Sequence, residues 1–241
     1  TSATIHGTVS PTHIHHERTQ GFPVFLPTRH SPSILDIFGP NLPSEDMKNF
    51  LDRVMRPPVF PLGVEELYSK RRVTTTRHGD TIVLPSPNER AKLYSLGDEI
   101  DPVPDGAVVI KVSHGYNHPR HGILFFRIFY KGRSVVMATD TEGYVGVDRK
   151  LADFARDAEL LIHDSEYDEH EYGDDVIIRQ GWGHSTWRMA VDVANLANVK
   201  RLALTHHNPG HDDAYLEKIL AKAQEVFPNA FLAQEGLAVE V

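Results

Sequence analysis

Apolar and polar residues alternate differently in the two halves of this chain. Short apolar runs separated by turn residues dominate the first half, whereas apolar runs alternate with segments of helical spacing in the second. The predicted strands are 3–9, 33–38, 60–62, 72–76, 81–84, 107–112, 123–130, 134–138, 159–162, 199–205 and 231–235. The predicted helices are 47–55, 148–158, 185–198 and 212–227, with one helical turn at 64–68. This pattern predicts a mixed α/β (α+β) fold.

Turn and capping residues mark where these elements begin and end. The turn Lys131-Gly132-Arg133 joins strands 123–130 and 134–138 into the clearest hairpin, and Gly79-Asp80 predicts an edge hairpin from 72–76 and 81–84. Polar residues of the kind that cap helices precede each predicted helix. The predicted caps are 44–46, Asp148, Ser185, and Asp212 or Asp213.

Composition limits the class of protein. With 241 residues, 40% of them hydrophobic, the chain can bury a large core, and we predict a single domain over residues 1–241. The sequence has no cysteine, so any metal must be held by nitrogen and oxygen. No run of about 18 apolar residues and no leader are visible, so we expect a cytoplasmic protein without a membrane partner.

The net charge of the chain limits which binding partners are expected. The formal charge of −8 disfavours broad electrostatic capture of nucleic acid, because phosphate backbones are bound mainly by Lys and Arg patches. A local basic run such as Lys70-Arg71-Arg72 would still suit a small phosphate.

Histidines gather at the ends of apolar runs, which is typical of a metal site. His13 and His15 alternate after the first run, so both imidazoles would leave its end on one side. Neutral imidazole is a common ligand for Zn, Fe or Mn, and two such ligands need others from distant loops. The further candidates are His118, Asp140, Asp164, His184, His206 and His207. His114 competes with His118 as the ligand of its loop.

The order of these residues resembles the metallo-β-lactamase superfamily, in its branch containing the tRNA-processing ribonuclease Z. The family motif HxHxDH matches residues 13–18, which read His-Ile-His-His-Glu-Arg. Four later stretches match as well: 138–141, 160–164, 183–186 and 200–206. The resemblance covers nearly the whole chain. It implies a four-layer αββα sandwich, and we expect its N-terminal strands to be missing from this chain.

The resemblance also implies the metal ligands and divalent metal cofactors. The implied ligands are His13, His15, His118, Asp140 and His206. Zn is the first choice, with Mn and Fe as alternatives, and one or two ions are expected. The second site departs from the family, because Glu17 is one methylene longer than aspartate and the Arg18 guanidinium has no lone pair. Glu17, His16 or His207 are the candidate substitutes.

Catalytic and substrate-binding roles follow from the same resemblance. His184 matches the family histidine that handles the leaving-group proton, and Asp164 matches the acid that orients it. His163 and Glu166 flank this pair and could exchange roles with Asp164. The predicted catalytic residues are His184, Asp164 and Glu17, and the predicted substrate-binding residues are Arg18 and His207.

These features together predict a metal-dependent phosphodiesterase that acts by metal-bound hydroxide attack. A cyclic nucleotide or other small phosphodiester is preferred over tRNA, because the chain is acidic and lacks a basic glycine-rich insertion like the arm of ribonuclease Z. The alternatives are a lactone or β-lactam hydrolase, with an ester substrate, and an impaired binding or scaffold protein. A homodimer is compatible with the sequence, although nothing in it marks an interface.

Overall fold

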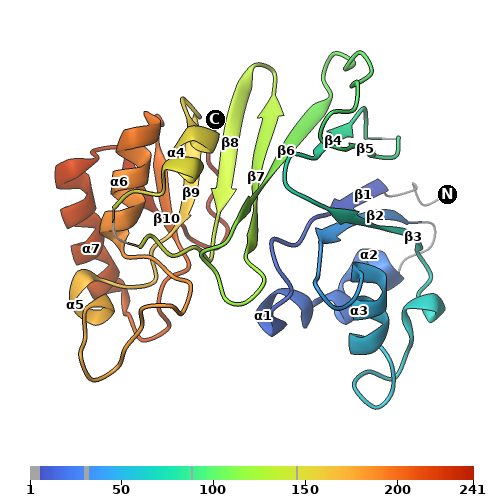
Figure 1. Cartoon of the computed structure of the whole chain (residues 1–241), viewed down its shortest axis with the longest axis horizontal. Helices are drawn as coiled ribbons and strands as arrows, with labels where there is room; N and C mark the ends of the chain where they lie inside the picture. Colours follow the sequence, from blue (N-terminus) through green and yellow to red (C-terminus); the bar gives the residue numbers. More distant parts are fainter. Residues whose placement is uncertain (1–5, 30–32, 88, 145) are drawn as a thin grey trace. The chain divides into compact units, whose positions relative to one another are not determined.

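The computed structural model describes residues 6–29, 33–87, 89–144 and 146–241. The chain forms two compact units, Thr1–Val112 and Ser113–Val241, and each is described by itself. Strands and helices are mixed in both units, which confirms the predicted α/β class (Figure 1). The predicted single domain and the missing N-terminal strands stay predictions. Part of the first predicted strand, residues 3–5, lies outside the described residues.

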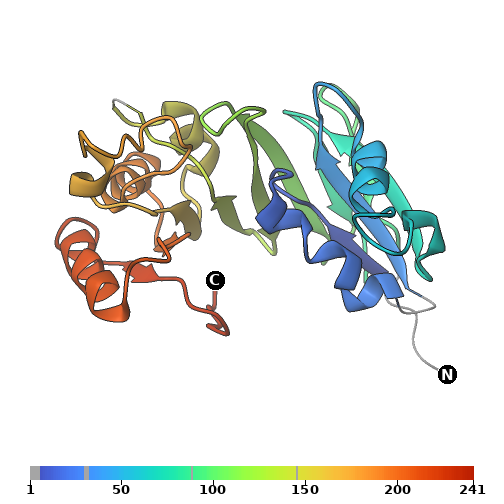
Figure 2. The same ribbon diagram turned by 90° about the horizontal axis from the view of Figure 1, so that it is seen from below.

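A parallel three-stranded sheet and one main helix form the core of the first unit. The strands are β1 (His6–Val9), β2 (Ile34–Pro40) and β3 (Lys70–Thr76), with β2 in the middle. Helix α3 (Met47–Val54) begins where the Asp46 side chain accepts the Asn49 amide at 2.8 Å, as predicted. The helix lies beside these strands (Figure 2), and its apolar residues share one core cluster with Ile37 of β2. The short helical elements of this unit are α1 (His16–Thr19), η1 (Phe22–Val24), α2 (Leu26–Arg29) and η2 (Val64–Glu66).

The predicted hairpin of residues 72–76 and 81–84 is wrong. Strand β3 pairs in parallel with β2, whereas β4 (Thr81–Leu84) pairs antiparallel with β5 (Lys92–Tyr94) and with β6 (Val108–Gly115). The intervening residues turn towards β6 instead, because the Gly79 amide donates to the Val112 carbonyl at 2.9 Å and the Val112 amide donates to Asp80 at 3.0 Å. Residues 60–62 form no strand, and β5 lies in a segment where no element was predicted.

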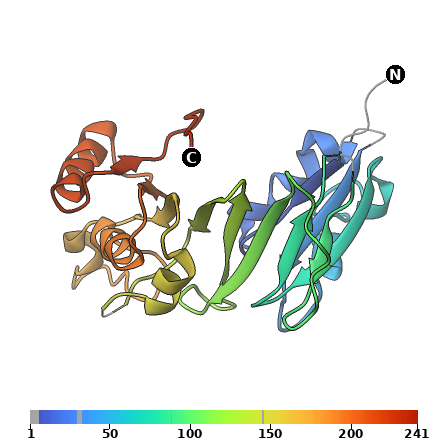
Figure 3. The ribbon, with the colours of Figure 1, turned by 90° about the horizontal axis from the view of Figure 1, so that it is seen from above.

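Four parallel strands, one antiparallel strand and the helices that cover them build the second unit. The strands are β7 (Ile123–Tyr130), β8 (Arg133–Ala138), β9 (Leu160–Asp164), β10 (Leu202–Thr205) and β11 (Ala230–Leu232). Strands β7 and β8 form the predicted hairpin, and β8, β9, β10 and β11 then pair in parallel in that order. The helices are α4 (Arg149–Ala155), α5 (Glu169–Tyr172), α6 (Trp187–Ala197) and α7 (Asp213–Val226). Figure 3 shows α7 beside β11.

Alanine and branched apolar side chains fill the space between α4, α6 and the parallel strands. The fully buried Ala190, Val191 and Ala194 on α6 meet Leu161 and Leu204 of the strands in one core cluster. The predicted caps Asp148 and Asp212 are confirmed, since each side chain accepts the amide three residues later. Ser185 is not the cap of α6; Thr186 takes this place and accepts the Met189 amide at 3.2 Å.

The parallel arrangement positions the candidate site. Strands β8, β9 and β10 run in the same direction, so their carboxyl ends meet at one edge of the sheet. Registers Ala138↔His163 and Thr205↔Asp164 set the ends of the three strands level. Among the residues that the structure describes, no helix has both the length and the apolar character that a bilayer crossing requires.

Candidate metal centre

The HxH motif of the first unit lies in a loop, between the end of β1 and the start of α1. The two histidines follow the strand by a few residues, and their rings meet, with centroids 4.6 Å apart and planes at 90°. His13 is buried, and its Nε2 lies 2.9 Å from Glu17 Oε1, one helical turn away. Burial raises the pKa of Glu17, but hydrogen bonds from its backbone and from His13 outweigh burial and lower it.

Arg18 follows Glu17 on helix α1. Its Nε lies 3.9 Å from Glu17 Oε1, and its side chain is about one-third exposed. The guanidinium charge therefore lies beside a carboxylate that also contacts His13. The predicted substrate role of Arg18, the catalytic role of Glu17 and the ligand roles of His13 and His15 stay predictions.

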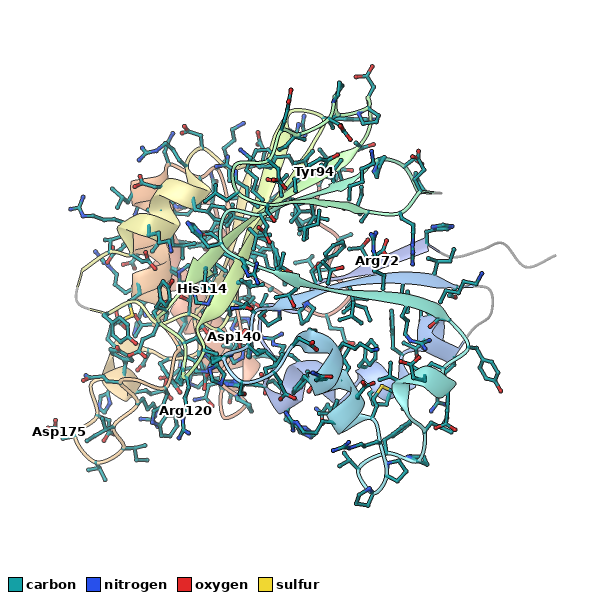
Figure 4. All side chains as sticks on the ribbon, turned by 45° about the vertical axis from the view of Figure 1, so that its right-hand side comes forward. Arg72, Tyr94, His114, Arg120, Asp140 and Asp175 are labelled. Carbon is teal, nitrogen blue, oxygen red and sulfur yellow. The ribbon has the colours of Figure 1, made fainter. Side chains whose placement is uncertain are left out.

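The basic run at the start of β3 is part of the structure of the first unit instead of an open phosphate site. Arg72 lies against the buried Asp36, with Nε 3.0 Å from Oδ1, and Figure 4 labels it on the ribbon. Arg71 donates to the carbonyls of Val64 and Leu67 at 2.6 and 3.1 Å. Both guanidinium groups therefore connect strands and loops of this unit.

Asp140 and His206 meet at the carboxyl edge of the parallel strands in the second unit. Asp140 follows β8, as Figure 4 shows, and His206 follows β10; their Oδ1 and Nε2 atoms are 2.8 Å apart. Both residues have left-handed backbones, with φ of 56° and 59°. Non-glycine residues adopt this conformation at some energetic cost, and such residues cluster at functional sites. The backbone thus turns sharply at each strand end to bring these two side chains together.

Asp164 and His184 form the predicted hydrogen-bonded pair. Asp164 Oδ2 accepts from His184 Nδ1 at 2.7 Å, and its Oδ1 accepts the backbone amides of Ser185 and Glu166 at 3.0 and 3.1 Å. Asp164 is fully buried. Burial lowers the pKa of His184, but the bond to Asp164 and the charge of that carboxylate outweigh burial and raise it. The pair has the predicted geometry, while its catalytic role stays a prediction.

Glu166 joins the two imidazoles of this edge. Its Oε2 lies 3.2 Å from His184 Nδ1 and 3.2 Å from His206 Nδ1, and the two rings stack with centroids 4.6 Å apart. Burial lowers the pKa of His206, but its bonds to Asp140 and Glu166 raise it to about 10. Burial raises the pKa of Glu166, but the bond to His206 and the nearby imidazole charges lower it overall. The sequence placed Glu166 beside the pair without assigning it to His206.

His118 is held by the loop that carries His184. Its Nδ1 lies 3.1 Å from the Gly183 carbonyl, so Nδ1 donates and the lone pair belongs to Nε2. The ring centroids of His118 and His184 are 5.4 Å apart. The competing His114 lies on β6, and its Nε2 contacts the His121 carbonyl at 3.0 Å. His118 is therefore the better ligand candidate of the two.

His207 does not join this cluster through its described contacts. Its Nε2 lies 3.3 Å from the Ala233 carbonyl, beyond β11, and burial lowers its pKa. His211 contacts Glu171 at 2.9 Å, and His163 contacts the Asp164 carbonyl at 2.7 Å. The predicted substrate-binding role of His207 stays a prediction without a supporting contact.

Glu142, for which no role was predicted, organises the loops around the edge. This fully buried carboxylate accepts the Tyr172 hydroxyl at 2.5 Å and the amides of Gly181 and Gly183 at 2.8 and 2.9 Å. Asn117 holds the same segment by donating to the Glu142 carbonyl at 2.7 Å. The only sequence signal was its place two residues after Asp140, which does not separate a structural acid from a ligand.

The donor set of the second unit fits a divalent metal ion. Asp140, His184 and His206 each offer a ligand atom, and these atoms lie within 4.8 Å of one another. Imidazole nitrogen and carboxylate oxygen together suit Zn, Mn or Fe. Asp140 and Glu166 face the two ring nitrogens of His206, so this edge carries the negative charge that a cation site requires.

Comparisons with known proteins agree with this architecture. A sequence model of the Beta-lactamase superfamily domain matches residues 9–207. A ribonuclease Z from Synechocystis sp. is 40% identical over 113 residues, which span 46% of this chain and 32% of that protein. A ribonuclease Z from Sulfurisphaera tokodaii is 27% identical over 92% of this chain and 76% of that protein. The first two curated relatives are thus matched over about a third of their length.

A solved structure gives the same result for the fold. The metallo-beta-lactamase fold protein YhfI from Bacillus subtilis is 18% identical and aligns over 97% of this chain and 78% of its own, with a TM-score of 0.63. The fold class predicted from the sequence is therefore confirmed as a metallo-β-lactamase fold. The chain belongs to the metallo-β-lactamase superfamily, in its ribonuclease Z-like branch.

Proposed function

We propose that this protein is a metal-dependent hydrolase of phosphodiesters. The observation that carries the proposal is the pair of ligand candidates Asp140 and His206, whose facing atoms are 2.8 Å apart, next to His184, whose Nδ1 is bound to Asp164. Hydrolysis with proton transfer needs metal ligands and, beside them, a histidine that is oriented by a carboxylate. Membership of the ribonuclease Z-like branch supports the same class of reaction.

The ligands proposed from the family resemblance are His13, His15, His118, Asp140 and His206. A divalent ion bound there supplies Lewis acidity towards phosphoryl oxygen and lowers the pKa of water at neutral pH. Zn is preferred, and whether one or two ions bind is decided by Glu17 and Arg18 in the first unit.

His184 handles the proton of the leaving group. Its Nδ1–H donates to Asp164, so the opposite nitrogen, Nε2, gives its proton to the departing alkoxide, which leaves as the alcohol. Asp164 has its other oxygen occupied by two backbone amides, so it orients the ring and does not itself need to bind substrate. Because His184 also lies among the potential ligands, the alternative role is a metal ligand.

The substrate is proposed only as a phosphodiester. The sequence favoured a cyclic nucleotide or another small molecule over tRNA, but the relatives found are named ribonuclease Z, and the comparisons do not support a small-substrate preference. Small phosphodiesters and an unprocessed tRNA are therefore the two substrates to compare. A lactone or β-lactam substrate is the alternative within the same fold.

The test combines metal content with turnover. We expect the purified chain to retain a divalent metal by elemental analysis and to hydrolyse bis-p-nitrophenyl phosphate. His206→Ala and Asp140→Asn should each lose metal and turnover, with turnover falling by about 100-fold or more. His184→Ala should keep its metal and lose turnover, if His184 is the acid. His170→Ala, which changes an exposed histidine on α5, is the matched control.

Other outcomes separate the alternatives. A wild-type chain without metal and without turnover would favour the scaffold role. Hydrolysis of a lactone or β-lactam without phosphodiester hydrolysis would favour the other enzyme class. Equal loss of metal and turnover in His184→Ala would make His184 a ligand.

A further inference from the structure

We propose that Glu166 is a positioning residue that fixes the tautomer of His206 and so increases metal affinity; this inference rests on the proposed metal-dependent function. One carboxylate oxygen of Glu166 contacts the imidazole rings of both His184 and His206. Glu166 Oε2 lies 3.2 Å from Nδ1 of both His184 and His206. No role for this residue follows from the match to the family.

The two histidines depend on Glu166 to different extents. His184 already has Asp164 at 2.7 Å from its Nδ1, so Glu166 is its more distant carboxylate. At His206, Asp140 faces Nε2 at 2.8 Å, and the carboxylate facing Nδ1 is Glu166. Removal of Glu166 should therefore affect His206 more than His184.

The chemical consequence concerns which nitrogen carries the lone pair. The contact at 3.2 Å is an ion pair, and a nearby carboxylate, which can only accept, stabilises a proton on Nδ1 of His206. If Nδ1 keeps its proton, the proton that His206 loses on binding a metal is the one on Nε2, the nitrogen that lies beside the ligand candidate Asp140. Outer carboxylates of this kind fix the ring orientation and raise the basicity of metal-binding histidines.

The backbone holds Glu166 in place from both sides. The Ser165 amide donates to the Thr205 carbonyl at 2.9 Å, directly before His206. The Tyr167 amide donates to the Ser185 carbonyl at 3.1 Å, directly after His184, and the Tyr167 side chain is buried. The residue between these two anchors is thus fixed relative to both histidines. The Glu166 carboxylate therefore has a fixed position, which a mobile acidic side chain on the surface does not have.

The electrostatic arrangement supports the same role. Two imidazoles stacked at 4.6 Å and an interplanar angle of 17° would repel each other if both were charged or if both bound a cation. One carboxylate placed against both rings offsets this repulsion. The side chain of Glu166 is 16% exposed, so solvent screens this charge only partly.

The experiment measures zinc affinity, because this quantity reports positioning without requiring turnover. Wild type, Glu166→Ala and Glu166→Gln are titrated with Zn²⁺ in competition with a chromophoric chelator. We expect Glu166→Ala to bind Zn²⁺ about 10- to 100-fold more weakly. Glu166→Gln should lie between, since its amide oxygen still accepts a hydrogen bond. Glu225→Gln, an exposed residue on α7 with the same change in charge, should match wild type.

A second measurement reports the tautomer directly. Ring-nitrogen NMR of the zinc-loaded chain should show His206 protonated at Nδ1 in wild type and a mixed or altered signal in Glu166→Ala. Far-UV circular dichroism verifies that each variant is folded. Unchanged affinity and an unchanged His206 signal in the folded Glu166→Ala variant would overturn the role of Glu166 and leave the proposed function intact. A wild-type chain that binds no Zn²⁺ would overturn both.

Discussion

Single residues at the carboxyl edge of β8, β9 and β10 show how far the sequence could predict the site. Asp140, Asp164, His184 and His206 were all predicted, and the structure brings these four together within the second unit. The family motifs identified them because each motif has a fixed residue type at a fixed place. Glu166 received no role at His206 because its contact depends on the turn after β9 and not on a motif.

Arg18 is the residue whose replacement tests the altered motif most directly. It lies beside Glu17, which contacts His13, so its positive charge stays close to a proposed ligand. A fixed cation disfavours a second divalent ion through charge repulsion. We predict that Arg18→His raises the bound metal from about one to about two ions per chain, as measured by elemental analysis.

Arg18→Lys is the control for this prediction, because it keeps the charge and offers no ligand at neutral pH. It should leave the metal content unchanged. A wild-type chain that already holds two ions, or an Arg18→His variant with unchanged metal content, would show that Arg18 does not limit the second site.

At the scale of elements, the sequence predicted long periodic segments well and pairing partners poorly. The hairpin of β7 and β8 was correct because its turn is local, whereas β3 and β4 are close in sequence and pair with different neighbours. Parallel pairing of β2 with β3 joins segments about 30 residues apart, which alternation alone does not specify. The cap of α6 was misplaced by one residue, since Ser185 instead donates to the Thr141 carbonyl at 2.6 Å.

The loop between α5 and α6 depends on one buried acid. Glu142 accepts hydrogen bonds from Tyr172, Gly181 and Gly183, and Figure 4 labels Asp175 at the outer part of this loop. Glu142→Ala leaves three donors without this acceptor. Unsatisfied buried groups cost about 1–3 kcal/mol each, so we predict a loss of about 3 kcal/mol in the free energy of unfolding after partial solvation. Urea unfolding measures this loss.

Two further observations make this prediction specific. Tyr172→Phe removes only one of the three donors and should cost about 1 kcal/mol. In Glu142→Ala, limited proteolysis should cut within residues 173–183 faster than in wild type, because the loop loses its anchor. Equal proteolysis and a cost near that of Tyr172→Phe would mean that Glu142 is not the anchor.

At the scale of the whole molecule, the family assignment was available from the sequence because several motifs occurred in the same order. The mixed α/β class and the metallo-β-lactamase fold are confirmed. Composition set useful limits too, since the absence of cysteine leaves only nitrogen and oxygen ligands for a metal. The substrate could not be predicted from the sequence, because net charge describes the average surface and not the edge where a phosphodiester would bind.

Stability towards acid is a whole-molecule property that one buried histidine should influence. His163 lies on β9 with 1% exposure, and burial lowers its pKa below 6.5, although the Asp164 backbone and nearby carboxylates partly offset this effect. Below about pH 6.5 the unfolded chain binds a proton at this residue that the folded chain does not. The free energy of unfolding therefore loses this contribution as pH falls from 6.5 towards the folded pKa.

Replacing His163 by Gln removes this titration. Between pH 6.5 and 5.5, we predict that wild type loses up to about 1.4 kcal/mol more stability than His163→Gln, measured by urea unfolding in a chelator so that metal release does not contribute. His184 and His206 have raised pKa values and act in the opposite direction, so the difference between the two proteins isolates His163. His170→Gln changes an exposed histidine and should follow wild type. Parallel pH profiles for wild type and His163→Gln would show that His163 titrates equally in the folded and unfolded chains.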